Sequence, residues 1–223
     1  MKIVEPYIEV EPIDGIKIMK NIEKACRTCY RSEGNITDDS YKKLLNNCIT
    51  RGHESVLEHE KVTVRMYADL GVYKDITRHR IASFSIESTR YCNYGKDKFD
   101  NEIKFIKPCN IDEGTKLYDN WYNACKCVED NYLEMSKLGA TPDQMRMILP
   151  HSIAAEIVMT ANIREWKHVL ELRTTSHVHP AIRQVLIPLL LYFKKEMPEI
   201  FGEIPYDEDF PKEKYAELRK LQD

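Results

Sequence analysis

The sequence contains no apolar run that approaches the roughly 20 residues of a membrane-spanning helix. Residues 1–6 hold no apolar signal region, and the chain has no internal repeat or low-complexity segment. It also lacks an excess of one charge, because 33 Lys and Arg residues are balanced by 36 Asp and Glu residues. Domains that bind duplex nucleic acid are usually basic. These absences predict a cytoplasmic protein that binds neither membranes nor polymeric nucleic acid.

A disulfide framework is not expected either, because the seven cysteines are odd in number. The 223 residues suit one domain, 1–223, with a sizeable core. Cys26 and Cys29 have a spacing compatible with redox chemistry or with half of a zinc site. Cys125 and Cys127 do not supply a second pair at the usual spacing. We therefore favour small buried thiols over a metal site.

What the sequence does contain is a concentration of hydrogen-bond donors in residues 78–91, which read RHRIASFSIESTRY. A core strand rarely carries so many donors, and a solvated surface uses Lys and Glu more often than Arg. If the stretch is extended, Ser88 and Arg90 point the same way and hold one phosphate between them. Arg78 and Arg80 would form a second pair, with His79 on the opposite face. The alternative is a basic surface segment that makes local salt bridges.

Apolar spacing and turn signals predict a mixture of helices and strands. We expect helices over 16–30, 41–49, 71–76, 117–138, 142–150, 162–173 and 180–198, and strands over 61–66 and 153–160, the first strand from the alternation of Val62, Val64 and Met66. On the helix over 117–138, one buried stripe is expected from Leu117 to Met135. Thr141 and Asn162 are expected as helix N-caps, with Glu165 at the capping-box position after Asn162. Residues 95–114 are expected to form a loop, apart from 103–106, and are a candidate mobile lid. Residues 206–223 are expected to form a peripheral helix or a frayed end.

The Arg-His-Arg run at 78–80, followed by seven residues and Ser88, resembles the signature of the flavin-dependent thymidylate synthases, the ThyX family. Two further blocks, at 52–59 and 162–173, resemble other segments of this family, and the three blocks occur in the family's order. The resemblance covers roughly residues 52–183. Ser85 and Ile86 stand where the family has Asn and Glu, so Ile86 cannot take the polar role of that glutamate. Glu87 is the next residue.

The resemblance implies a fold and an activity. The implied fold is α/β of the α+β type, a single domain with a largely antiparallel sheet flanked by long helices. The implied assembly is a homotetramer with sites shared between subunits. The implied reaction is the reductive methylation of dUMP to dTMP, with FAD as cofactor and with NADPH and 5,10-methylenetetrahydrofolate as co-substrates.

The resemblance also implies roles for individual residues. The flavin-binding positions are His53, Ser55, Arg78, His79, Arg80, Asn162, Arg164 and His168, where the family often has Asn at the last position. The dUMP-binding positions are Asp75, Arg78, Glu87, Ser88, Thr89, Arg90, Arg146 and Arg173. Arg173 is the catalytic residue, because a guanidinium against the uracil carbonyl and N3 favours the charge that develops there.

Two other functions stay open from the residues. One is a nucleotide- or RNA-binding module that uses the Arg-His-Arg stretch for phosphates without catalysis. The other is a flavoprotein with different nucleotide chemistry, which Ile86 makes possible.

Overall fold

A mostly antiparallel sheet lies at the centre of the computed structural model, which describes residues 1–96, 98 and 100–221. Its strand order is β4-β6-β3-β2-β7, with bounds β2 Tyr7–Val10, β3 Lys61–Asp69, β4 Ala82–Ile86, β6 Ala154–Asn162 and β7 Glu217–Lys220. The β2–β3, β3–β6 and β4–β6 pairs are antiparallel, and the β2–β7 pair is parallel. The predicted fold class is therefore confirmed.

The two faces of this sheet differ because side chains alternate along each strand. On β3, Val64 and Met66 are fully buried, whereas Thr63 and Arg65 lie on the other face and reach solvent. The polar face carries cross-strand contacts, such as the Thr63–Thr160 hydroxyl pair at 2.8 Å and the Arg65–Glu156 ion pair at 2.8 Å. The apolar face is the floor of the main core.

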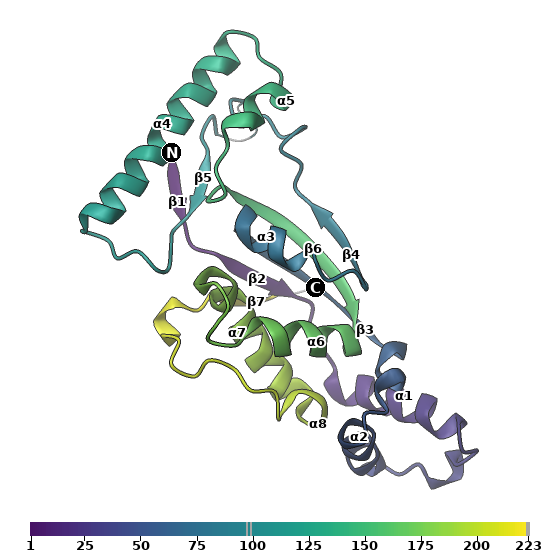
Figure 1. Ribbon diagram of the computed structural model, residues 1–223. Helices are drawn as coiled ribbons and strands as arrows, with labels where there is room; N and C mark the ends of the chain where they lie inside the picture. Colours follow the sequence, from purple (N-terminus) through teal and green to yellow (C-terminus); the bar gives the residue numbers. More distant parts are fainter. Residues whose placement is uncertain (97, 99, 222–223) are drawn as a thin grey trace.

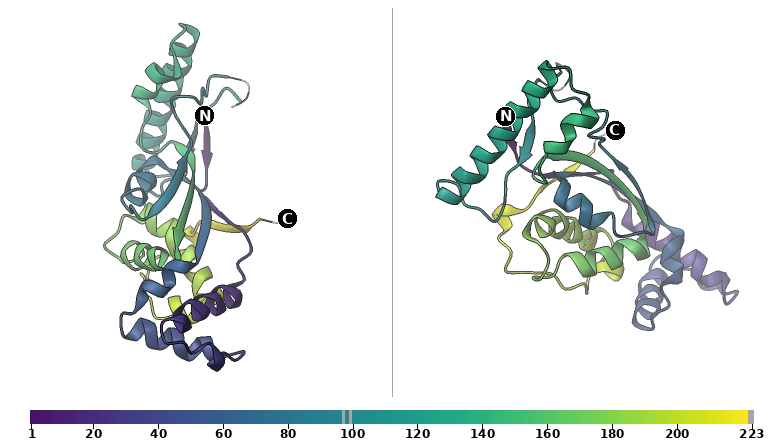
Figure 2. Two further views of the ribbon diagram at one scale, coloured as in Figure 1. Left: turned by 90° about the vertical axis from the view of Figure 1, so that its right-hand side faces the viewer. Right: turned by 45° about the horizontal axis from the view of Figure 1, so that its top comes forward.

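Helices cover the apolar face (Figure 1). They are α3 Leu70–Ile76, α6 Ile163–Arg173 and α7 Pro180–Glu196, and the short helix α8 Pro198–Phe201 packs against α7. The helices α1 Gly15–Thr28 and α2 Ser40–Thr50 join the same core at one end of the molecule. The 22-residue helix α4, Lys116–Lys137, lies at the opposite end (Figure 2).

A second, smaller core lies beneath α4. There β1 Lys2–Val4 pairs in parallel with β5 Lys104–Ile106, and the short helix α5 Pro142–Met145 closes the cluster. Phe105, Tyr132 and Met145 are fully buried in it. Leu70 packs against both cores, so the two are joined through the start of α3.

Local signals set several of the helix ends. Asn162 caps α6, because its side-chain oxygen accepts from the backbone N–H of Glu165 at 2.8 Å, as predicted. Thr141 and Gln144 form a capping box at the start of α5. Gly52 follows the C-cap residue of α2 and has a φ of +70°, a conformation that suits glycine. Short 3-10 helices complete the chain: η1 Glu33–Asn35, η2 Glu54–His59, η4 Arg146–Ile148 and η5 Lys212–Lys214.

Three sequence predictions need correction. The helix expected over 142–150 is split into α5 and η4. Leu117 was expected on the buried stripe of α4, but it is 62% exposed at the first turn of that helix. Within residues 206–221, the short helix η5 is followed by β7, which pairs with β2 over four residues, so this part of the segment is neither a long peripheral helix nor a frayed end. In the loop predicted as a lid, residues 97 and 99 lie outside the described part, and the lid stays a prediction.

Candidate functional site

The Arg-His-Arg segment lies at the point where α3 ends and the chain turns towards β4. The backbone N–H groups of Thr77 and His79 still bond to carbonyls of the last helical turn. Arg78 and Arg80 are exposed, whereas His79 is only 6% exposed. The two arginines thus reach solvent while the histidine between them is buried. The pairing of Arg78 with Arg80 on one ligand stays a prediction.

His79 holds the guanidinium of Arg173, which is 94 residues away in the sequence. Nε of Arg173 donates to Nε2 of His79 at 3.0 Å, and Nη2 donates to the carbonyl oxygen of Asp75 at 3.2 Å. Because Nε2 accepts, the network assigns the imidazole proton to Nδ1. That atom lies 3.4 Å from Oε1 of Glu165. The end of α3 and the turn after it thus fix Arg173, and Glu165 lies beside the histidine that holds it.

The electrostatics of this cluster keep His79 neutral. Burial lowers the pKa of His79 to about 4, with further lowering by the charges of Arg173 and His168. Burial also raises the pKa of Glu165, and His168 opposes that rise. The acceptors of Arg173 are therefore uncharged groups. Its positive charge remains available to an anion or to charge that develops on a ligand oxygen.

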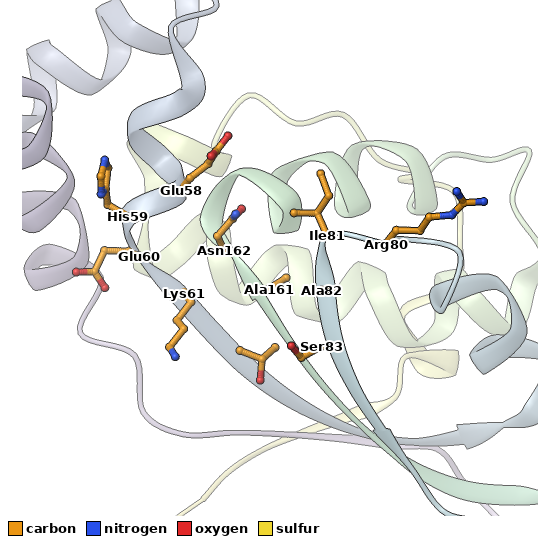
Figure 3. Close-up of a pocket in the computed structure, with 11 residues that line it drawn as sticks. Glu58, His59, Glu60, Lys61, Arg80, Ile81, Ala82, Ser83, Ala161 and Asn162 are labelled. Carbon is orange, nitrogen blue, oxygen red and sulfur yellow. The ribbon is translucent and has the colours of Figure 1, made fainter.

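A groove lies beside this cluster, between the end of β6 and the start of β4. It has a volume of about 590 Å³ and is lined by Glu58, His59, Glu60, Lys61, Arg80, Ile81, Ala82, Ser83, Thr160, Ala161 and Asn162. Figure 3 shows Glu58, Ile81 and Asn162 on three separate elements around it, with Arg80 directed away from them. A second pocket of about 370 Å³ shares these three residues and adds Arg164 and His168. The two form one hollow.

Two carboxylates already lie beside Arg164 in this hollow. Nη1 of Arg164 donates to Oε1 of Glu58 at 2.6 Å, and its Nε lies 4.0 Å from Glu54. The Oδ1 atom of Asn162 is used by the helix cap, which leaves its amide N–H groups as donors. An anionic ligand therefore competes with Glu58 for Arg164.

A further group of predicted residues lies before β6, near α5. Nε of Arg90 donates to Oδ1 of Asp143 at 3.1 Å, and both side chains are exposed. Arg146 is exposed on η4, three residues after Asp143. Arg90 and Arg146 thus belong to one neighbourhood. Arg173 is the last residue of α6 and lies beside His79, so it belongs to a different neighbourhood.

The expected extended arrangement of Ser88 and Arg90 is not formed. Residues 88–91 make a turn, in which Tyr91 N–H donates to the Ser88 carbonyl at 3.0 Å. The Ser88 hydroxyl oxygen accepts from the Arg90 N–H at 3.3 Å. Because β4 ends at Ile86, strand alternation no longer applies here. Thr89 lies within the turn and is half-buried.

Glu87 is turned towards the polar face of the sheet. Its Oε1 accepts from the Tyr94 hydroxyl at 2.9 Å, and its Oε2 accepts from the Glu156 N–H at 3.3 Å. It lines a pocket of about 260 Å³ together with Tyr7 and Tyr67. Ile86 pairs with Ile157 and is 40% exposed. The carboxylate is therefore positioned by β6 and by Tyr94.

Some residues of the hollow were absent from the sequence predictions. Glu165 was expected only as a capping residue, and its contact with His79 has no local signal. Glu58 belongs to the 52–59 block, in which the resemblance implies flavin binding by His53 and Ser55. Both of those are exposed at the start of η2, whose Glu54, Glu58 and His59 line the hollow. The sequence offers one signal for Glu58: it follows Glu54 by four residues, a spacing that brings two side chains to the same side of a helix.

Known proteins resemble this chain over most of its length. The family model described as "Thymidylate synthase complementing protein" matches residues 16–199. A flavin-dependent thymidylate synthase of Pyrococcus abyssi is 33% identical over 156 residues, which are 70% of this chain and 63% of the relative. One of Geobacter sulfurreducens is 29% identical over 186 residues, which are 79% of this chain and 78% of the relative.

Among solved structures, the chain is similar to a UMP/dUMP methylase, PolB, from Streptomyces cacaoi, bound with 5-Br dUMP. The TM-score is 0.74 at 21% identity, over 91% of this chain and 96% of that one. This likeness shows the fold. The match spans less than two thirds of the length of the Pyrococcus abyssi relative.

Proposed function

The chain belongs to the thymidylate synthase complementing protein family, and from this premise we propose that it is a flavin-dependent thymidylate synthase that converts dUMP to dTMP. The names of its relatives support the proposal. The observation that carries it is the guanidinium of Arg173, held by His79 and Asp75 with its charge uncompensated by those acceptors. The alternative of an RNA-binding module without catalysis finds no support among these relatives.

The cofactor of the proposed reaction is FAD, and the donors around the hollow suit it. Asn162 offers amide N–H groups, and Arg80 and Arg164, which line the hollow, offer guanidinium groups to a pyrophosphate. Arg78 lines neither pocket and is exposed two residues before Arg80. Arg164 can bind the pyrophosphate once this ligand displaces Glu58 from the guanidinium. When bound and reduced by NADPH, the flavin would supply the hydride. The one-carbon unit comes from 5,10-methylenetetrahydrofolate.

The residues near α5 are proposed to bind the nucleotide phosphate and sugar. Arg90 and Arg146 supply guanidinium groups, and Ser88 and Thr89 supply hydroxyl groups from the adjacent turn. Arg173 is proposed to bind the uracil carbonyl and N3, which favours negative charge on the ring oxygen. Asp75 and Glu87 are the proposed acidic contacts.

No thiol of the chain is needed as a nucleophile. Cys92 directly follows the turn at residues 88–91, which is proposed to bind the nucleotide. Burial and the nearby charge of Glu87 raise the pKa of this cysteine. A raised pKa lowers the fraction of reactive thiolate at neutral pH. The electrostatic role of Arg173 therefore takes the place of covalent activation.

A homotetramer with sites shared between subunits would complete this arrangement. Arg90 and Arg146 precede β6 in the chain, whereas Arg173 and Arg164 follow it. Both groups also include exposed arginines that a neighbouring subunit could reach. We propose residues 1–223 as a single domain, since Leu70 joins the two cores. A cytoplasmic location fits seven cysteines that are all free.

An absorption spectrum of the purified protein, recorded with and without dUMP, tests the proposal. We expect a flavin spectrum that dUMP perturbs, because the pyrimidine and the flavin must lie close together for hydride transfer. Tritium release from dUMP labelled at C5, measured with folate and NADPH, tests turnover. A colourless protein that takes up no FAD and binds oligonucleotide with steep salt dependence would refute it.

A second candidate is a flavoprotein that acts on a related nucleotide. Ile86 favours it, because an apolar side chain stands where the family has a glutamate near the ligands. The PolB protein, named a UMP/dUMP methylase, provides a comparison. Parallel tritium-release assays with dUMP and UMP separate the two: faster release from UMP would favour the second candidate.

A further inference from the structure

The helices α1 and α2 pack together at one end of the molecule (Figure 1). A cluster of cysteines lies on these two helices. The Sγ atoms of Cys26 on α1 and Cys48 on α2 are 3.5 Å apart. Both residues are buried, with 6% and 7% exposure. The contact joins positions 22 residues apart in the sequence. It places two thiols face to face, a geometry that ordinary apolar packing does not require.

A third cysteine lies beside this pair and reaches solvent. Cys29 is the C-cap of α1 and is exposed. It follows Cys26 by three positions, and residues with this spacing are neighbours on a helix surface. The charge on Cys29 contributes to the raised pKa of Cys26, which agrees with that proximity. The three cysteines therefore form a path from solvent to the buried pair.

The distances suit disulfide chemistry better than metal binding. A disulfide bond is about 2.05 Å long, so the two sulfur atoms need to approach by about 1.5 Å. Small rotations about the side-chain bonds of Cys26 and Cys48 can provide a movement of this size. In the described part of the chain, no group of three or more His, Cys, Asp or Glu residues is arranged to hold a metal ion.

We propose that Cys26 and Cys48 form a reversible disulfide, and that Cys29 is the entrance through which a small-molecule disulfide oxidises them. The Cys29 thiolate attacks the small disulfide RSSR and releases one RSH. Cys26 then attacks the Cys29 sulfur, which releases the second RSH and links Cys26 to Cys29. Cys48 attacks the Cys26 sulfur, and Cys29 leaves and is protonated. In sum, two protein thiols and RSSR give one protein disulfide and two RSH.

The need for an entrance follows from the burial of the pair. A small disulfide cannot reach a sulfur with as little exposed surface as that of Cys26. Cys29 meets this need, because it is exposed and neighbours Cys26 on the helix. Burial and the contact with Cys48 also raise the pKa of Cys26, so its attack on the Cys29 sulfur depends on the proximity of the two side chains and not on a large thiolate fraction. Transient disulfides of this kind occur in cytosolic proteins.

The test uses oxidised glutathione on the full chain in oxygen-free buffer. Samples are quenched in acid, alkylated with N-ethylmaleimide after unfolding, and mapped by mass spectrometry of peptides. We expect a Cys26–Cys48 linked peptide, with Cys29 alkylated, and its loss after treatment with dithiothreitol. Glutathione that stays on Cys29 while Cys26 and Cys48 are alkylated would overturn the proposal. A stable Cys26–Cys29 end product would overturn it as well.

Variants test the path. In Cys29→Ser, we expect the Cys26–Cys48 link to form about tenfold more slowly or not at all, because the accessible attacking thiol is lost. Cys127→Ser is the matched control, since Cys127 is also exposed but lies on α4 at the other end of the molecule. It should oxidise at the rate of the unaltered protein. An unaltered rate in Cys29→Ser would show that Cys29 is not the entrance.

Discussion

Two kinds of arginine occur among the proposed ligand-binding residues, and their partners distinguish them. Arg173 is half-buried and donates to two uncharged acceptors, His79 Nε2 and the Asp75 carbonyl. Arg90 and Arg164 are exposed and each donates to a carboxylate. Neutral partners fix a guanidinium without cancelling its charge, whereas a carboxylate cancels that charge until a ligand displaces it. The first kind suits activation of a bound ring, and the second suits exchangeable binding of a phosphate.

Burial explains why the two regions differ. In the interior a charge interacts more strongly, so the fixed position of Arg173 has a large electrostatic effect. At the surface, solvent and salt weaken the Arg90–Asp143 and Arg164–Glu58 pairs, and such pairs typically contribute less than about 1 kcal/mol. A ligand can therefore displace Asp143 or Glu58 at little cost.

Loss of the fixed arginine should have the largest effect. We expect Arg173→Ala to lower kcat for dTMP formation by about 10³-fold while FAD remains bound, as removal of a preorganised donor does elsewhere. Turnover is measured by tritium release, and bound FAD by its absorption. Arg219→Ala is the control, because Arg219 is exposed and pairs with Glu217 on β7. Normal turnover in Arg173→Ala would remove the distinction between the two kinds of arginine.

Loss of an exposed arginine should act on binding more than on chemistry. We expect Arg90→Ala to raise KM for dUMP by about tenfold, with a smaller change in kcat, because one charge-assisted contact to phosphate is lost. Steady-state kinetics with varied dUMP measure both constants. An equal loss in kcat at saturating dUMP would mean that Arg90 acts in the transition state as Arg173 does.

The buried histidine predicts a dependence of stability on pH. The pKa of His79 is about 4, below its ordinary value of 6.5, because of burial and the charges of Arg173 and His168. The unfolded chain therefore takes up a proton at a higher pH than the folded chain. The contribution of His79 to the free energy of unfolding is fully present above pH 6.5 and is lost as the pH decreases towards 4. Allowing for solvent screening, we expect a loss on the order of 1 kcal/mol between pH 7 and pH 5.

Urea unfolding at pH 7 and pH 5 measures this loss. His79→Gln is the informative variant, because an amide oxygen can accept from Arg173 but does not titrate. The free energy of unfolding should change less between pH 7 and pH 5 in that variant than in the unaltered protein. Equal differences in both proteins would assign the pH dependence to groups other than His79. The neighbouring Glu165 is not such a group, because its raised pKa favours the folded state as the pH falls.

Removal of a competing carboxylate should have the smallest effect and the opposite direction. We expect Glu58→Gln to tighten FAD binding by a few-fold, because Arg164 loses its surface partner and is free for the ligand. Titration of the apoprotein with FAD measures the affinity. Glu113→Gln provides a matched control, since Glu113 also forms an exposed pair, with Lys107. Weaker FAD binding in Glu58→Gln would show that Glu58 supports the site.

Local patterns predicted much of the fold. The spacing of Val62, Val64 and Met66 predicted β3, and Asn162 and Thr141 were identified as helix caps. These features depend on neighbours within a few residues. The strand β7 was missed because its four residues have no signal of their own, and their partner β2 lies more than 200 residues earlier. The turn at Ser88 was missed because the end of β4 is set by its pairing with β6.

By itself, the sequence determined which side chains this protein has for binding anions and the order in which they occur. Residue chemistry and spacing carry that information. Only the tertiary structure decided which arginine stays charged and fixed and which is neutralised at the surface. The partners of Arg173 and Arg164 lie about 100 residues away. Burial and distance, which determine the strength of a charge interaction, exist only once those segments pack together.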